Sequence, residues 1–288
     1  MKAVLKHELS GYFHSLTAYV FGTFLLVFVG IGSMLYNIQQ AVANFEYVLG
    51  FISLIFVGLV PILTMRVLAE ERKQRTDQLL YSLPITTTDI ILGKYLALLV
   101  VFFNSTSNCC FLSTNLCKVW RCLSFDIVWK LDRIFSLWGA ALIAIGMFIS
   151  SLTENLGMAA GICVAVVLFN YYSVSLADYI SSSVIGSIIA LVVLILIVGL
   201  IIKILTKNDA VAAGVGAVLL IAVAVIYFAK KSVFEGLLPN IMKTLSLFER
   251  FYTFVNGVFD MTAIVFYLSV IVFFLFLCVQ SLEKRRYN

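Results

Sequence analysis

Long runs without a formal charge, separated by short charged stretches, dominate this sequence. The first two runs, residues 16–36 and 47–65, are each close to the ~20 apolar residues that a membrane-spanning helix needs. Hydrophobic residues make up 62% of the chain and charged residues 12%, which is far from the balance of a soluble domain. We therefore predict an all-α, polytopic membrane helical bundle rather than a soluble enzyme with a very apolar core.

Six later runs predict further crossings. They lie at residues 95–117, 134–152, 156–177, 179–202, 210–229 and 261–282, which gives about eight transmembrane helices in all. The first of these is the weakest, because its apolar part ends at Phe103 and polar residues follow. Lys and Arg gather on the side of the N-terminus in this arrangement, so the positive-inside rule predicts that both termini are cytoplasmic.

Residues 1–15 precede the first run. Apolar residues recur there at helical spacing, with Lys2, Lys6 and Glu8 between them. This pattern predicts a short N-terminal helix lying in the inner interface of the membrane. A positively charged tail ahead of the first span is an equally good interpretation.

Residues 66–94 form a charged stretch between the second and third runs, and charges at mid-bilayer cost several kcal/mol each, so the stretch must lie in water. Leucines give a helix over residues 69–83 an apolar flank, and Pro84 is expected to end it. Thr86 followed by Asp89 resembles a capping box that opens a second helix at Ile90. A helix, a turn and a re-entering helix can transmit a push from a soluble partner into a spanning helix.

An amphipathic stripe runs through residues 230–260, where apolar residues stand three and four positions apart between 234 and 255. We predict external amphipathic helices here, divided into two short pieces by Pro239. They either rest on the membrane surface or cap a pathway, and packing against the bundle is an equal alternative.

Motifs for chemistry are missing from the sequence. It has no GxxxxGK[ST] phosphate loop, no catalytic triad signature and only two histidines, both near the start of the chain. We predict no catalytic residue, no cofactor and no metal site. A secondary carrier is disfavoured, because no ionisable group falls deep in a predicted span.

Three stretches of the sequence carry a family pattern. They are AEERKQRTDQLLYSLPITTTDIILGKYLA from residue 69, GAALIAIGMFISSLTEN from residue 139, and FERFYTFVNGVFDMTAIVFYLSVIVFFLFLCVQSLEKRR from residue 248. Together they resemble the ABC type 2 export permeases. The first is closest to the gliding-motility and nitrous-oxide-maturation branch, whose members carry E-E-[KR]…LL…LP[IV]…[DE]IxLGKxLA. The matches cover about a third of the chain and follow the order of the family.

The resemblance implies a single transmembrane permease domain over residues 1–288, with a six-span core and an extra pair formed by the sixth and seventh runs. It implies the permease subunit of an exporter in the plasma (inner) membrane, paired with a second permease subunit as a homo- or heterodimer. ATP hydrolysis would belong to a separate ABC ATPase subunit, and no nucleic acid is involved. Two alternatives stay open: a membrane-embedded subunit that transmits force or anchors a partner without moving a solute, and a secondary carrier.

By the same resemblance, the ATPase would dock on the 69–83 helix and on the short turn at residues 151–155. Charged residues would provide complementarity and leucines a desolvated anchor. The implied ATPase-coupling residues are Glu70, Glu71, Arg72, Arg75, Leu79, Leu80, Leu83 and Glu154.

Residues 104–137 depart from the family, which has an apolar hairpin in this place. The block holds four of the six cysteines and two of the three tryptophans. One hypothesis is that it is read in a shifted frame, with the family pattern resuming near Trp138. The alternative is a metal site or a disulfide-tied loop, but the cysteines form no CxxC pair and no histidine lies nearby.

Overall fold

A computed structural model describes residues 1–40, 46–76, 85–120, 125–179, 186, 192, 195, 236–256, 258 and 260–287. The described elements, in chain order, are α1 (Lys2–His14), α2 (Leu16–Gly32), the π-helix η1 (Ser33–Gln39), α3 (Glu46–Thr64), α4 (Arg66–Gln74), α6 (Thr87–Trp120), α7 (Phe125–Leu152), α8 (Leu156–Tyr179), α11 (Leu237–Leu245), α12 (Leu247–Val255) and α13 (Met261–Tyr287). None of the described residues lies in a strand. The predicted all-α fold is confirmed.

Six of the described helical stretches are long and apolar enough to cross a membrane. They are Leu16–Gln39, Tyr47–Gln74, Thr87–Asn108, Phe135–Leu152, Leu156–Tyr179 and Met261–Arg285. They match the predicted runs that begin at residues 16, 47, 95, 134, 156 and 261, so the polytopic membrane bundle is confirmed. The two remaining predicted runs, 179–202 and 210–229, fall almost entirely outside the described residues.

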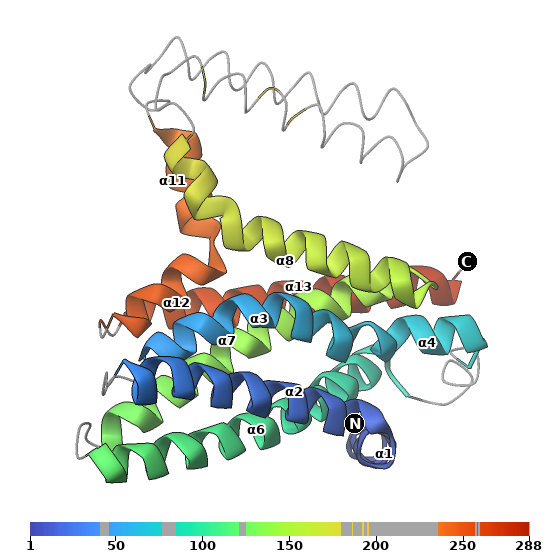
Figure 1. The fold of residues 1–288 in the computed structure, drawn as a ribbon. Helices are drawn as coiled ribbons and strands as arrows, with labels where there is room; N and C mark the ends of the chain where they lie inside the picture. The colour runs from blue at the N-terminus through green and yellow to red at the C-terminus, as the bar shows by residue number, and fades with distance from the viewer. Residues whose placement is uncertain are drawn as a thin grey trace. The chain divides into compact units, whose positions relative to one another are not determined.

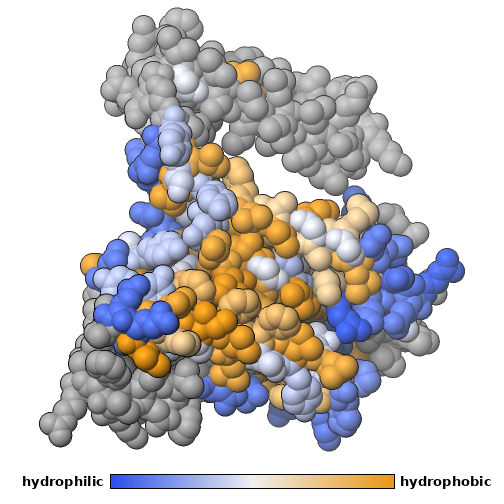
Figure 2. Space-filling view, in the orientation of Figure 1, coloured by the Kyte–Doolittle hydropathy of each residue, from blue (hydrophilic) through white to orange (hydrophobic). Residues whose placement is uncertain are grey.

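The chain divides into two compact units, residues 1–169 with 250–288 and residues 170–249. In the first unit α7 is the central helix and contacts α13, α6, α3 and α4 (Figure 1). Its Phe135–Leu152 segment is 83% buried, whereas the Met261–Arg285 segment of α13 is only 17% buried. In Figure 2 hydrophobic residues cover the middle of this unit, and hydrophilic residues gather toward its ends. That distribution is the one expected of a membrane-embedded bundle.

In the second unit the end of α8 packs on α11 and the start of α12. The Asn170 side chain donates to Leu245 O (3.3 Å) and accepts from Leu247 N (3.0 Å), so it bridges the break between the two short helices. Asp178 and Lys243 form an exposed ion pair of 2.7 Å. These contacts hold the short helices against α8 within this unit.

An aromatic cluster fills the core of the first unit. It consists of Phe56, Phe102, Phe135, Trp138 and Phe251, contributed by α3, α6, α7 and α12. The Trp138 and Phe251 rings stack with centroids 4.6 Å apart, and Phe56 and Trp138 are both fully buried. Such ring pairs contribute beyond their buried area, so the cluster fixes how these four helices meet.

Glycines bring α7 close to its neighbours. A Cβ added at Gly139 would lie 2.2 Å from the Phe102 ring, and one at Gly146 would lie 2.3 Å from Thr64 Oγ1. Small residues of this kind allow the close helix approach that drives packing in membranes.

The helix predicted over residues 69–83 is wrong in its bounds. α4 begins at Arg66 and ends at Gln74, because Arg75 adopts a left-handed conformation with φ 56°. Arg75 N donates to Arg72 O and Thr76 N donates to Glu71 O, which is the Schellman pattern of a helix end. The structure does not describe residues 77–84, so the effect expected of Pro84 stays a prediction.

Two further predicted boundaries, the start of α6 and the division at Pro239, can be compared with the structure. Thr86 Oγ1 accepts a bond of 3.2 Å from Asp89 N, which confirms the Thr86 half of the predicted capping box, although α6 begins at Thr87 rather than Ile90. The division expected at Pro239 is wrong, since the break between α11 and α12 falls at Ser246. Pro239 sits in the first turn of α11, where an amide has no helical acceptor to lose.

The atypical block at residues 104–137 is helical where it is described. α6 continues to Trp120 and α7 begins at Phe125. The side chains of residues 109–134 lie outside the description. The shifted-frame hypothesis and its metal or disulfide alternative therefore stay predictions.

We expect Gly146→Ala to lower the thermal unfolding midpoint of the detergent-solubilised chain. The added methyl group would overlap Thr64, and overpacking of this kind costs about 1–3 kcal/mol. Gly161→Ala on α8 is the matched control, because its Cβ would meet nothing within 4 Å. Equal midpoints for the two variants would contradict the packing described here.

Candidate functional site

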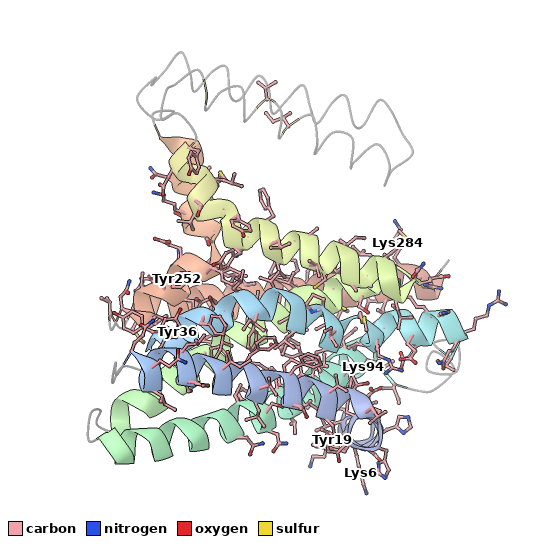
Figure 3. All side chains as sticks on the ribbon, in the orientation of Figure 1. Lys6, Tyr19, Tyr36, Lys94, Tyr252 and Lys284 are labelled. Atoms are coloured by element: carbon pink, nitrogen blue, oxygen red, sulfur yellow. The ribbon has the colours of Figure 1, made fainter. Side chains whose placement is uncertain are left out.

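Charged elements gather at one end of the first unit. α1, α4, the start of α6, the turn between α7 and α8, and the end of α13 meet there (Figures 1 and 3). Figure 3 places Lys6, Lys94 and Lys284 at this end, and Tyr36 and Tyr252 toward the opposite end. Both chain ends therefore lie on one side of the bundle, as predicted, while their cytoplasmic location stays a prediction.

A buried ion triad centred on Lys94 lies at this end. The Lys94 ammonium is 2.6 Å from Glu8 Oε1 of α1 and 2.5 Å from Glu71 Oε1 of α4. Lys94 itself is only 1% exposed. A buried ammonium costs several kcal/mol unless it is paired and hydrogen-bonded. The triad therefore ties α1 and α4 to the first turns of α6.

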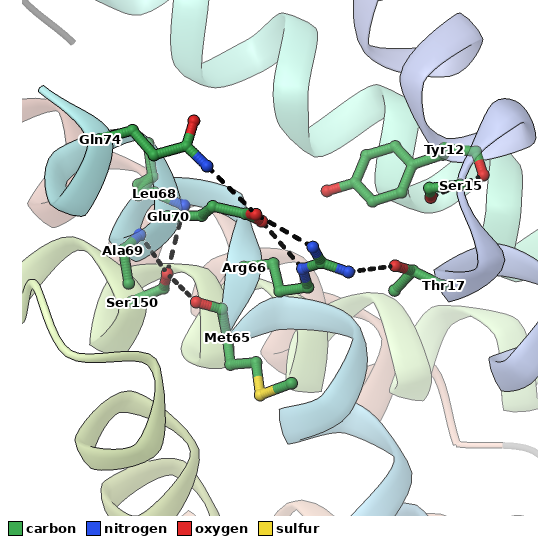
Figure 4. A network of polar contacts seen from close by, with 10 residues as sticks. All are labelled: Tyr12, Ser15, Thr17, Met65, Arg66, Leu68, Ala69, Glu70, Gln74 and Ser150. Carbon is green, nitrogen blue, oxygen red and sulfur yellow. Dashed lines mark hydrogen bonds and ion pairs between the residues drawn. The ribbon is translucent and has the colours of Figure 1, made fainter. Parts of the chain in front are cut away.

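The start of α4 is capped from another helix. Ser150 Oγ of α7 accepts from Leu68 N (3.2 Å) and Ala69 N (3.1 Å), and it donates to Met65 O (3.1 Å) (Figure 4). The first backbone amides of a helix have no acceptor within the helix. Ser150 of α7 accepts from them and so replaces an N-cap side chain of the local sequence. This contact fixes α4 directly on the central helix.

The outer side of α4 is tied to α2. The Arg66 guanidinium makes two bonds to the Glu70 carboxylate (2.8 and 3.0 Å) and a third to Thr17 Oγ1 (2.8 Å). Gln74 adds a longer contact to Glu70 of 3.5 Å. All four side chains are drawn in Figure 4. α4 is thus held by α2, α6 and α7 together.

The turn between α7 and α8 is held by the end of α13. Arg285 donates to Glu154 at 2.5 Å, and Ser281 donates to Ser151 O at 3.2 Å. On the same helix Glu283 accepts from Thr87, the first residue of α6, at 3.0 Å. The second predicted contact region therefore lies at the same end as α4.

The predicted ATPase-coupling residues differ in how open they are. Arg75 is exposed, as is Glu154, whose side chain is 64% exposed. The Glu70 and Glu71 side chains are 32% and 24% exposed and are engaged with Arg66 and Lys94. Arg72 is only 7% exposed. Leu79, Leu80 and Leu83 lie outside the described residues.

Sequence reasoning missed Glu8, Lys94 and Ser150 as parts of this site. Lys94 offered a usable signal, since it stands directly before an apolar run and a charge in that place needs a partner. Its two partners lie 86 and 23 residues away in sequence, so spacing could not identify them. Ser150 gave no signal, because a serine within a span usually bonds its own helix.

Residues 15–152 match the protein-family model described as ABC-2 family transporter protein. The matched segment includes α4, Lys94 and Ser150. No curated protein matches the chain significantly.

We expect Lys94→Met to destabilise the chain by roughly 3 kcal/mol, because removing the ammonium leaves two carboxylates facing each other. Amide hydrogen exchange in α1 should become faster, and the thermal unfolding midpoint should fall. Lys73→Met, at an exposed position of α4, is the control and should change little. Adding Glu8→Gln and Glu71→Gln to Lys94→Met should recover part of the loss. Unchanged exchange of α1 in Lys94→Met would contradict the role given to the triad.

Proposed function

Because residues 15–152 place this chain in the ABC-2 transporter family, we propose that it is the transmembrane permease subunit of an ATP-binding-cassette exporter. The family match and the six apolar helices establish a multi-pass, membrane-embedded permease component. The further steps concern its energy source, its partners and the direction of transport. In this proposal a separate ABC ATPase subunit supplies the energy, and export proceeds across the plasma (inner) membrane.

The observation that carries the proposal is the way α4 is held. It is a charged helix that directly continues a spanning helix, and it is fixed to three further helices by Ser150, Thr17 and Lys94. A displacement of α4 would therefore move α2, α6 and α7 as well. An element fixed in this manner suits a part that receives force from outside the membrane.

The ATPase contact is assigned to the exposed surface that the end of α4 and the turn between α7 and α8 form at this end; α1 is not part of it. Among the expected coupling residues that the structure describes, Arg75 at the end of α4 and Glu154 in the turn between α7 and α8 are the most exposed. Glu70 bonds Arg66 on the same helix, Glu71 pairs with Lys94, and Arg72 is buried, so these three are assigned a supporting role behind the contact surface. Leu79, Leu80 and Leu83 keep the role of an apolar anchor in the proposal.

A second permease subunit, identical or different, completes the transport path. Apolar side chains project from α2 and α13 without cover from the described part of the first unit, among them Leu16 at 79% and Val272 at 67% exposed. Such surfaces suit lipid or a neighbouring permease chain. ATP-driven closure of the ATPases would tilt α3 and α7 through α4 and expose the path alternately to the two sides.

The test is co-purification of an ATPase with the intact chain, followed by reconstitution of the complex in proteoliposomes. We expect Arg75→Glu to weaken recovery of the ATPase about tenfold, since a like charge placed in an interface is repelled. Lys6→Glu makes the same charge change at an exposed position of α1 and should leave recovery unchanged.

Arg75 is a sharper test than charge reversal at Glu70 and Glu71, because both carboxylates also hold α4 in place. Equal recovery of the ATPase with Arg75→Glu and Lys6→Glu would contradict the assigned contact. A topology probe that places residues 66–76 on the outer face of the membrane would contradict the proposal as a whole.

A further inference from the structure

A cavity of about 860 Å³ opens between α1 and α4. Its volume falls within the range of small-molecule sites in proteins. Val4 of α1 and Val67 of α4 give it apolar walls, and Glu8, Tyr12 and Glu70 are among its polar lining. The cavity therefore has the mixed character of a site for an amphiphilic molecule.

The charges around the cavity do not balance. Three carboxylates, those of Glu8, Glu70 and Glu71, line it, against the Arg66 guanidinium in the lining and the Lys94 ammonium behind it. With His7 counted as neutral, the sum is one negative charge. Three of the five N–H donors of Arg66 bond Glu70 and Thr17, so this guanidinium is already engaged within the protein.

One carboxylate oxygen is left open by the triad. Lys94 bonds Oε1 of Glu8, and Oε2 of Glu8 receives no hydrogen bond from the described residues. Glu8 lines the cavity and its side chain is 17% exposed, so the carboxylate is within reach of a molecule in the cavity. A carboxylate in that position favours a cationic neighbour.

Tyr12 is the independent indication of a ligand. It follows Glu8 by four residues on α1, so the two side chains share one side of that helix. Tyr12 is 9% exposed and lines the cavity; Ser15 Oγ donates to its backbone carbonyl, and no described residue hydrogen-bonds its hydroxyl. Figure 4 shows this hydroxyl directed from α1 toward Arg66 and Glu70. The hydroxyl is not among the buried atoms that lack a partner, so it is accessible from the cavity, and its donor and acceptor are both available to a ligand there.

Burial, reinforced by the nearby Glu8 carboxylate, raises the pKa of Tyr12 above its ordinary value. The hydroxyl therefore keeps its proton at neutral pH, and its oxygen can still accept a hydrogen bond.

We propose that this cavity binds a primary ammonium group, carried either by an aminoethyl lipid headgroup or by a free small amine. The ammonium lies between Glu8 Oε2 and the Tyr12 hydroxyl, and the attached carbon chain packs against Val4 and Val67. A primary ammonium has three N–H donors, so it can bond both oxygens at once. Its charge also removes the imbalance around the cavity. The proposal does not depend on an ATPase partner or on transport.

Tyr12→Phe is the decisive variant, because it removes a hydroxyl that holds nothing else in the described chain. The chain is placed in phosphatidylcholine nanodiscs and titrated with butylammonium, with the thermal unfolding midpoint as readout. We expect saturable stabilisation of the wild type and about tenfold weaker binding by Tyr12→Phe, as for the loss of one hydrogen bond to a charged group. Tyr19→Phe, 59% exposed on α2, should bind like the wild type.

Tetramethylammonium carries the same charge without N–H donors and should bind clearly more weakly than butylammonium. Equal binding of the two cations, equal binding by wild type and Tyr12→Phe, or no binding of butylammonium would each overturn the proposal.

A second arm identifies the source of the ammonium. Native mass spectrometry of chain released from nanodiscs of equal phosphatidylcholine and phosphatidylethanolamine counts retained lipids. Selective retention of phosphatidylethanolamine by the wild type, reduced in Tyr12→Phe and displaced by butylammonium, supports the lipid source. Butylammonium binding without selective lipid retention supports a free amine.

Discussion

The ammonium of Lys94 is the group on which one end of this bundle depends. It is almost fully buried at the entrance to an apolar spanning helix, where an unpaired charge would cost several kcal/mol. Two carboxylates satisfy it, and they come from the N-terminal helix and from the helix that follows the second span. α1 is therefore held against α6 by Glu8, and α4 is held near the start of α6 by Glu71. The geometry of the proposed coupling site follows from the satisfaction of this one charge.

α7 links that end of the unit to its core. At one end Ser150 holds the first amides of α4, and within the bundle Trp138 and Phe135 of the same helix join the aromatic cluster with Phe251 of α12. Between them Gly146 and Gly139 let α3 and α6 approach closely. Close-packed interiors transmit strain, so in the proposed mechanism a displacement of α4 would reach the cluster through α7. The connection through α7 supports a permease whose conformational change is driven from one side of the membrane.

The parts of the fold that were predictable from sequence are those with a local cause. Long uncharged runs identified six of the described spans, and Thr86 identified the cap of α6. The end of α4 was not predictable, because an arginine rather than a glycine or asparagine takes the left-handed position. The partners of Lys94 and the cap supplied by Ser150 come from residues distant in sequence, and only the tertiary fold brings them together. Of the expected coupling residues, charge alone could not tell exposed Arg75 from buried Arg72.

The cavity between α1 and α4 has a consequence for coupling that follows from linkage. A ligand held against Glu8 and Tyr12 on α1 and beside Arg66 and Glu70 on α4 binds most tightly when the two helices are in the described arrangement. It therefore stabilises that arrangement and opposes any displacement of α4 away from α1. By reciprocity, a partner that displaces α4 lowers the affinity for the ligand by the same factor by which the ligand lowers the affinity for that partner. If both proposals hold, the ammonium ligand and the ATPase would be coupled through the position of α4, with no direct contact between them.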